Sequence, residues 1–102
     1  MSLQKRYLKS RPVTKVTFRL PGEAVERAHA VSLVGDFNNW DPAANPMKRL
    51  KSGEFKLTLD LESGREYHFR YLIDDRTWEN DWEADKYLPS GFQHAENSVV
   101  VV

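Results

Sequence analysis

The sequence contains no cysteine, which excludes disulfides, thiolate catalysis and cysteine-ligated metals. It also has no excess of charge, since fifteen basic residues balance fifteen acidic ones, whereas nucleic acids and anionic membranes attract a basic surplus. No apolar run approaches the ~20 residues of a membrane helix, and residues 1–8 lack the apolar core of a secretion signal. We therefore expect a cytoplasmic protein that binds neither nucleic acid nor membrane.

Motifs for catalysis and for metal binding are missing as well. The five glycines are scattered and form no phosphate-binding loop, and no serine has the Gly-x-Ser-x-Gly context of a hydrolase nucleophile. His29, His68 and His94 come from separate segments without metal-ligand spacing. The carboxylates between residues 74 and 85 are interpreted as residues that keep a loop soluble, with a calcium site as the alternative. We expect no enzyme activity, no metal and no cofactor.

Alternating apolar and polar residues indicate strands rather than helices. Residues 13–20 (VTKVTFRL) and 66–73 (EYHFRYLI) have the period of two that is typical of half-buried strands, and no segment shows a helical stripe of ten or more residues. The valine run at residues 98–102 predicts a strand buried on both faces. The segments expected to form strands are 13–20, 29–35, 54–61, 66–73 and 98–102, with 47–50 as a short edge strand; residues 23–28, 36–46 and 79–96 are interpreted as loops.

The number and spacing of these segments define the expected architecture. About seven strands in a chain of 102 residues predict one all-β domain, an antiparallel β-sandwich. We place this domain at residues 13–102. Residues 1–12 carry four cations, and we expect them to form an extended N-terminal segment that runs over the surface or is frayed.

Tryptophan is the residue type that points to a function. Trp40, Trp78 and Trp82 all lie outside the alternating core segments. A tryptophan in a polar loop either covers the core or forms a contact surface. An exposed indole is flat and rigid, with an apolar face and a polar edge, and it matches the C–H face of a pyranose ring. Asparagine and arginine side chains nearby can then bond the sugar hydroxyls.

Three motifs, in order along the chain, resemble one known family. They are VSLVGDFNNW (residues 31–40), LDLESGREYHFRYLIDDRTWEND (59–81) and ENSVVVV (96–102). These stretches resemble the signatures of family 48 carbohydrate-binding modules. That family includes the glycogen-binding domain of the AMP-activated kinase β subunit and the N-terminal domains of isoamylases and branching enzymes. The resemblance covers about residues 13–102.

The resemblance implies an early-set, immunoglobulin-like sandwich that binds an α-1,4-glucan such as glycogen, starch or maltodextrin. It implies a sugar platform made by Trp40 and Trp78, with Arg70 bonding sugar hydroxyls from the strand between them. The alternation of residues 66–73 independently places Arg70 on the face opposite the aromatic residues. The family's last loop corresponds to residues 88–97, where the candidate contacts are Phe92, His94, Glu96 and Asn97.

The sequence departs from the family pattern at several positions. The turn Asp74–Thr77 is one residue longer than usual and lacks the usual glycine, so a shift of Trp78 relative to Trp40 is expected. Trp82 stands where the family usually has a non-aromatic residue, as either a platform or a lid. His94 and Glu96 replace polar residues of the last loop.

Two further functions stay open at this stage. The same fold could act as an interaction domain that docks on a glycogen-metabolism enzyme or a kinase, because exposed Trp and Arg also anchor protein interfaces. An enzyme is the least favoured reading, since kinship of fold with amylolytic proteins is only an analogy. The favoured prediction is a non-catalytic α-glucan-binding module whose partner is an oligo- or polysaccharide.

Overall fold

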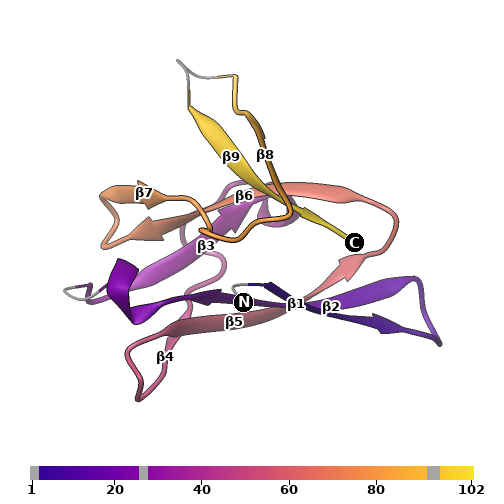
Figure 1. Cartoon of the computed structure of the whole chain (residues 1–102), viewed down its shortest axis with the longest axis horizontal. Coiled ribbons are helices and arrows are strands. Elements are labelled where there is room, and N and C mark those ends of the chain that lie inside the picture. Colours follow the sequence, from indigo (N-terminus) through magenta and orange to yellow (C-terminus); the bar gives the residue numbers. More distant parts are fainter. Residues whose placement is uncertain (1–2, 26–27, 92–94) are drawn as a thin grey trace.

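The protein is a sandwich of two antiparallel sheets in the computed structural model, which describes residues 3–25, 28–91 and 95–102 (Figure 1). The predicted all-β antiparallel sandwich is therefore confirmed. In the described residues, no helix is long and apolar enough to cross a membrane. The first sheet has the order β1 (Leu3–Leu8), β2 (Val13–Leu20), β5 (Phe55–Glu62) and β4 (Lys48–Arg49); the second has β3 (Val31–Gly35), β6 (Glu66–Ile73), β9 (Glu96–Val101) and β8 (Lys86–Pro89), and β7 (Thr77–Glu79) also pairs with β6.

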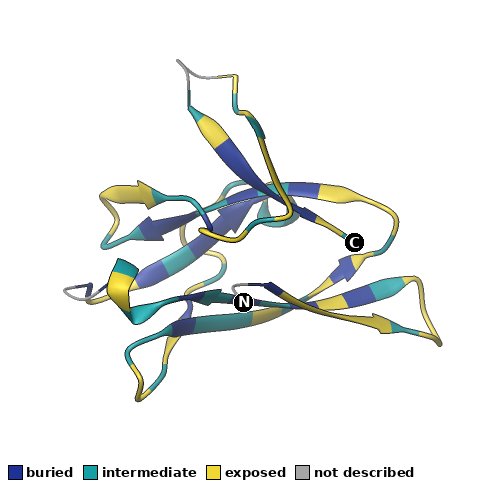
Figure 2. Ribbon diagram, viewed as in Figure 1, coloured by how far each residue is buried: buried dark blue, intermediate teal, exposed yellow. Residues whose placement is uncertain are grey.

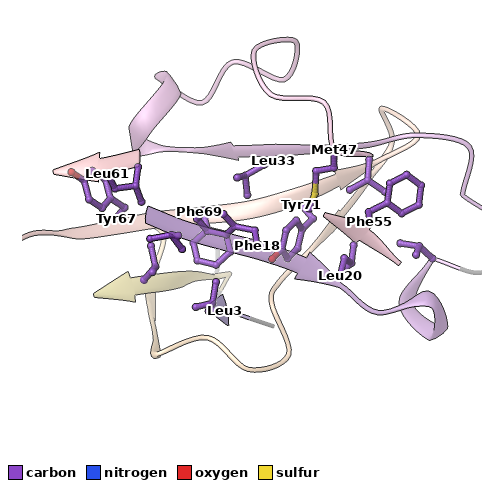
Figure 3. Close-up of a cluster of buried hydrophobic side chains, with 14 of the residues drawn as sticks. Leu3, Phe18, Leu20, Leu33, Met47, Phe55, Leu61, Tyr67, Phe69 and Tyr71 are labelled. Carbon is purple, nitrogen blue, oxygen red and sulfur yellow. The ribbon is translucent and has the colours of Figure 1, made fainter. Parts of the chain in front are cut away.

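The inner faces of both sheets form one core, as the alternation predicted. Phe18 of β2 and Phe69 of β6 are fully buried, and their rings meet edge to face with centroids 5.1 Å apart. Tyr71 continues this aromatic row against Phe69. Buried residues alternate mostly with partly buried ones along β2 and β6 (Figure 2), and Figure 3 shows the core side chains meeting between the sheets.

The described residues form nine strands, whereas about seven were expected, and the short or polar strands β1, β7 and β8 coincide with no segment that the alternation marked as a strand. Strand β1 falls within the N-terminal segment that was expected to run over the surface or to fray. It pairs with β2 along its whole length, from Leu3↔Phe18 to Leu8↔Val13, and Leu3 belongs to the core. Strands β7 and β8 fall in or beside residues 79–96, which were interpreted as a loop.

The outer face of the second sheet also has buried apolar residues. Val34, Leu72 and Val99 are buried but do not belong to the main core cluster. Strand register places them opposite Arg70, Trp78 and His68, respectively. The predicted burial of the last strand on both faces holds for residues 97–100, which are buried one after another, but not for Val101, which is 39% exposed. This face is therefore an apolar floor with aromatic and basic side chains around it.

The acidic segment 74–85 is not simply a solubilising loop, and that interpretation was wrong for Asp81. Asp81 is buried and accepts a hydrogen bond of 2.6 Å from the Tyr71 hydroxyl. Burial, reinforced by the Asp81 charge and by this hydrogen bond, raises the pKa of Tyr71 well above its usual value. The backbone N–H of Asp81 also donates to Ser98 Oγ of β9. Asp81 thus ties the segment after β7 to the sandwich.

Candidate functional site

A groove of about 780 Å³ lies on the outer face of the second sheet. Its walls come from the segment after β3, from β6 and β7, and from the β8–β9 hairpin, which projects away from the first sheet (Figure 1). Four residues that the sequence singled out line this groove, namely Trp40, Arg70, Trp78 and Asn97. The other described residues that line it are Asp36, His68, Pro89 and Ser90.

The motif GDFNNW (residues 35–40) folds into a tight connection that presents Trp40. It contains the short 3-10 helix η2 (Asp36–Asn38). The ring of Phe37 packs near Phe18 and Tyr67 and anchors the connection to the core. The Asn38 side chain accepts from the backbone N–H of Gly35 and donates to the carbonyl of Leu33, which closes the turn onto β3.

Trp40 is held by hydrogen bonds at its backbone and at its ring. Its backbone N–H donates to the Gly35 carbonyl at 2.9 Å. Its indole Nε1–H donates to Asp36 Oδ1 at 2.9 Å, while Asp36 Oδ2 accepts the backbone N–H of His68 at 2.8 Å. Asn39 and Trp40 both have φ of 57°, a left-handed conformation that costs energy for a bulky side chain. One carboxylate therefore connects the indole to β6 and helps to keep it in place.

Trp78 reaches the groove from β7, where it pairs with Leu72 of β6 and has 47% of its surface exposed. The turn before it departs from the family pattern, yet Asp74 and Asp75 both take positive φ, which aspartate tolerates better than most residues. Asp74 Oδ1 accepts the backbone N–H groups of His29 and Ala30. The longer turn thus still leaves Trp78 on the same groove as Trp40.

Arg70, Asn97 and His68 form a hydrogen-bonded row along the groove. Arg70 Nε donates to Asn97 Oδ1 at 2.8 Å, and Asn97 Nδ2 lies 3.1 Å from His68 Nδ1. Asn97 is only 7% exposed, so most of its surface is used within the protein. Among the described residues, none accepts a hydrogen bond from the terminal nitrogens of Arg70. These nitrogens are the donors that remain available for a ligand.

The remaining predicted contacts do not join this set in the described structure. Glu96 is exposed and does not line the groove, and its carbonyl accepts from Asn80 Nδ2. Phe92 and His94 lie outside the described residues. Trp82 is 52% exposed and does not line the groove.

Asp36 and His68 were not predicted as groove residues, and Pro89 and Ser90 were included only within residues 88–97, which the resemblance assigned to the last loop. His68 shares its outward face with Arg70 two residues later, so the alternation of β6 contained a usable signal. Asp36 lay within the quoted motif, but its role depends on contacts with Trp40 and β6. Pro89 and Ser90 depend on the pairing of β8 with β9, which was not predicted.

The groove has the chemistry of a binding site. It combines two indoles with nitrogen donors, and the carboxylate of Asp36 already accepts two hydrogen bonds. Across the part of the chain that the structure describes, no three His, Asp or Glu side chains gather in a way that could hold a metal ion. Flat aromatic surfaces beside fixed polar donors are suited to ligands that are apolar on their faces and hydroxylated at their rims.

A β-sandwich with such a groove on one sheet is typical of carbohydrate-binding modules. Residues 12–88 match carbohydrate-binding module 48, the isoamylase N-terminal domain family, and the chain belongs to this family. The resemblance seen in the motifs is thereby confirmed. The match ends before Asn97, so the family assignment itself rests on the first two motifs rather than on the last strand.

The chain is similar to short stretches of 1,4-alpha-glucan branching enzymes and of an amylopullulanase. A 1,4-alpha-glucan branching enzyme of Photobacterium profundum is 49% identical over 43 residues, which cover 41% of this chain and 6% of that enzyme. A 1,4-alpha-glucan-branching enzyme of Emericella nidulans is 43% identical over 49 residues, 48% of this chain and 7% of the enzyme. An amylopullulanase of Thermoanaerobacterium thermosulfurigenes is 32% identical over 75 residues, 72% of this chain and 4% of the enzyme. The chain thus spans only a small part of each relative.

Proposed function

We propose that this chain is a non-catalytic module that binds α-1,4-glucan by stacking glucose rings on Trp40 and Trp78. The observation that carries the proposal is that Trp40, Arg70, Trp78 and Asn97, which come from three distant segments, line one groove. An indole offers a rigid apolar surface at little entropic cost, and a pyranose offers a matching C–H face. The names of the relatives favour an α-glucan over other sugars.

The main polar residue of the proposed site is Arg70, which lies between Trp40 and Trp78 in the sequence. Arg70 projects from the outer face of β6, and its Nε is fixed by Asn97. The terminal nitrogens can then donate to sugar hydroxyls, and the planar guanidinium keeps its geometry while it does so. Because the groove is open to solvent, binding exchanges hydrogen bonds with water for similar ones with the sugar. We expect dissociation constants between about 1 µM and 1 mM.

Isothermal titration with maltoheptaose tests this proposal, with cellohexaose as the control for linkage. Saturable binding of the α-glucan alone supports it. The Trp40→Ala and Trp78→Ala variants should each lose detectable binding while the far-ultraviolet circular dichroism stays unchanged. Trp82→Ala is the matched control, because Trp82 is exposed but lies outside the groove. Full affinity in both groove variants would contradict the proposal.

A second candidate function is docking on a protein partner of glycogen metabolism. It is favoured by aromatic residues that are exposed away from the groove, Trp82 at 52% and Tyr7 at 64%. Exposed aromatic side chains are frequent anchors of protein interfaces. If wild-type protein binds no α-glucan, and if Trp82→Ala impairs capture of a branching enzyme, docking becomes the better description.

A further inference from the structure

The directions of the hydrogen bonds that join Arg70, Asn97 and His68 determine which ring nitrogen of His68 carries the proton. Arg70 Nε can only donate, so the Asn97 atom that it meets at 2.8 Å is the amide oxygen. The amide nitrogen of Asn97 therefore faces His68 Nδ1 at 3.1 Å. An amide nitrogen can also only donate. Nδ1 must then hold a lone pair, and the ring proton of a neutral His68 is on Nε2.

Asn97 and His68 have different roles in this arrangement. Asn97 is largely buried and bonds both neighbours. His68 lines the groove, and within the described ranges no residue forms a hydrogen bond with its Nε2. The Nε2–H group is thus a donor available to a ligand, and Asn97 determines that it is a donor.

We propose that Asn97 acts as a positioning residue and that His68, in its neutral Nε2–H form, is a specificity-determining donor of the glucan site. This inference rests on the proposed function. It implies that the site favours hydroxyl acceptors placed between Arg70 and His68. It also implies that binding needs the row in this one order of donors and acceptors.

Protonation of His68 is incompatible with this order of hydrogen-bond donors and acceptors. An imidazolium carries N–H at both ring nitrogens, so Nδ1–H would face the Asn97 amide N–H at a separation that suits a hydrogen bond. Turning the amide around would remove the acceptor from Arg70 Nε. Either outcome releases Arg70 or His68 from its fixed position. Glucan binding should therefore be weaker when His68 is protonated than when it is neutral.

The charged groups around His68 come from three elements. Asp36 of η2 accepts the His68 backbone N–H, and Arg70 follows on the same face of β6. Glu66, on that face too, is bonded to Lys86 of β8 at 2.6 Å. These groups have a balanced charge, so the argument rests on the hydrogen-bond direction rather than on a local excess of either sign.

The first test needs no ligand. Long-range ¹H–¹⁵N correlation spectra of the imidazole rings at about pH 8 report which nitrogen carries the proton. We expect His68 to show an unprotonated Nδ1 and a protonated Nε2, and the Asn97→Ala variant to show a mixture of tautomers. A protonated Nδ1 in the wild type would overturn the inference, as would an unchanged tautomer in the variant.

The second test is the pH profile of maltoheptaose affinity. The wild type should bind about threefold to tenfold more weakly at about pH 5 than at about pH 8, the value of about one hydrogen bond. His68→Asn keeps an acceptor near the Nδ1 position but has no titrating group, so its affinity should be nearly independent of pH. His68→Ala should bind more weakly than His68→Asn at about pH 8.

A control variant tests whether His68 is the histidine responsible. His29→Gln changes a histidine outside the groove, and its profile should match that of the wild type. A pH-independent wild-type affinity would overturn this inference and leave the proposed function standing. If the wild type binds no glucan at any pH, the proposed function fails and this inference fails with it.

Discussion

Asp36 is the residue on which the geometry of Trp40 depends most directly. Its two carboxylate oxygens accept from different donors, the indole of Trp40 and the backbone N–H of His68. The backbone bond continues the β3–β6 ladder beyond Gly35. A single side chain thus links the proposed platform to the strand that carries Arg70.

Replacing Asp36 by asparagine should weaken glucan binding. An amide has only one oxygen, so one of the two donors loses its acceptor. We expect a loss of affinity of about threefold to tenfold, the net value of about one hydrogen bond. Titration calorimetry with maltoheptaose measures this, and Asp41→Asn makes the same charge change outside the groove. Equal affinities of the two variants would show that Asp36 does not position the site.

At the scale of elements, the groove depends on how closely β3 approaches β6. Gly35 pairs with Phe69 at the end of β3. A Cβ built on Gly35 would lie 2.5 Å from the His68 carbonyl oxygen and 2.8 Å from Phe69 Cβ. Its φ of −172° is ordinary extended backbone, so glycine is needed there for space and not for backbone freedom.

Gly35→Ala should therefore destabilise the protein by about 1–3 kcal/mol, as expected for an overpacked interior. Urea unfolding monitored by circular dichroism measures the free energy of unfolding. Gly22→Ala is the control, because a Cβ at that position would meet its neighbours at ordinary contact distances of 3.6–3.7 Å. A Gly35→Ala variant as stable as Gly22→Ala would refute the close approach of the two strands.

The β6–β7 turn is connected to the start of β3 through Asp74. Hydrogen bonds from the backbone N–H groups of Ala30 and His29 lower the pKa of Asp74. A lowered pKa in the folded state means that ionised Asp74 stabilises the fold above the pKa of the unfolded chain. This contribution is lost as the pH falls through the lower, folded value.

We therefore expect the wild type to lose stability relative to Asp74→Asn as the pH falls below about 4. Asparagine tolerates positive φ and does not titrate, so the comparison isolates the charge. Thermal unfolding across this pH range provides the measurement. Asp75→Asn, in the same turn and also at positive φ, is the control. A constant difference between wild type and Asp74→Asn would contradict the assignment.

The elements that the sequence predicted well are those with strong alternation. Strands β2, β5 and β6 bury one face each, so their pattern shows directly in the residue types. Strand β1 has the polar sequence LQKRYL, and its place comes from pairing with β2 and from the ion pair of Lys5 with Asp85. Such long-range pairing leaves no local signal.

At the scale of the whole molecule, some residues of the candidate site could be predicted from local sequence patterns, whereas others depend on long-range strand pairing. Trp40, Arg70 and Trp78 were predicted from motifs that stand out in the sequence, and they line one groove. The link of Asn97 to His68 arises only when β9 lies beside β6. No pattern within one strand could have predicted it.

The arrangement of the sandwich also separates stability from binding. The main core lies between the sheets, whereas the groove lies on the outer face of the second sheet, where Val34 and Leu72 pair with Arg70 and Trp78. Side chains on this face can change without opening the core. Loss of sugar binding in a groove variant can therefore be distinguished from unfolding. The proposed tests with the Trp40 and Trp78 variants depend on this distinction.

The most direct test of the proposed platform is a maltoheptaose titration followed by the indole ¹H–¹⁵N signals of the three tryptophans. Each tryptophan contributes one such signal, so all three report at once in the wild-type protein. We expect the signals of Trp40 and Trp78 to shift and saturate together, with that of Trp82 unmoved, because only the first two line the groove. Shifts at Trp82 alone, or at none of the three, would contradict α-glucan binding in this groove.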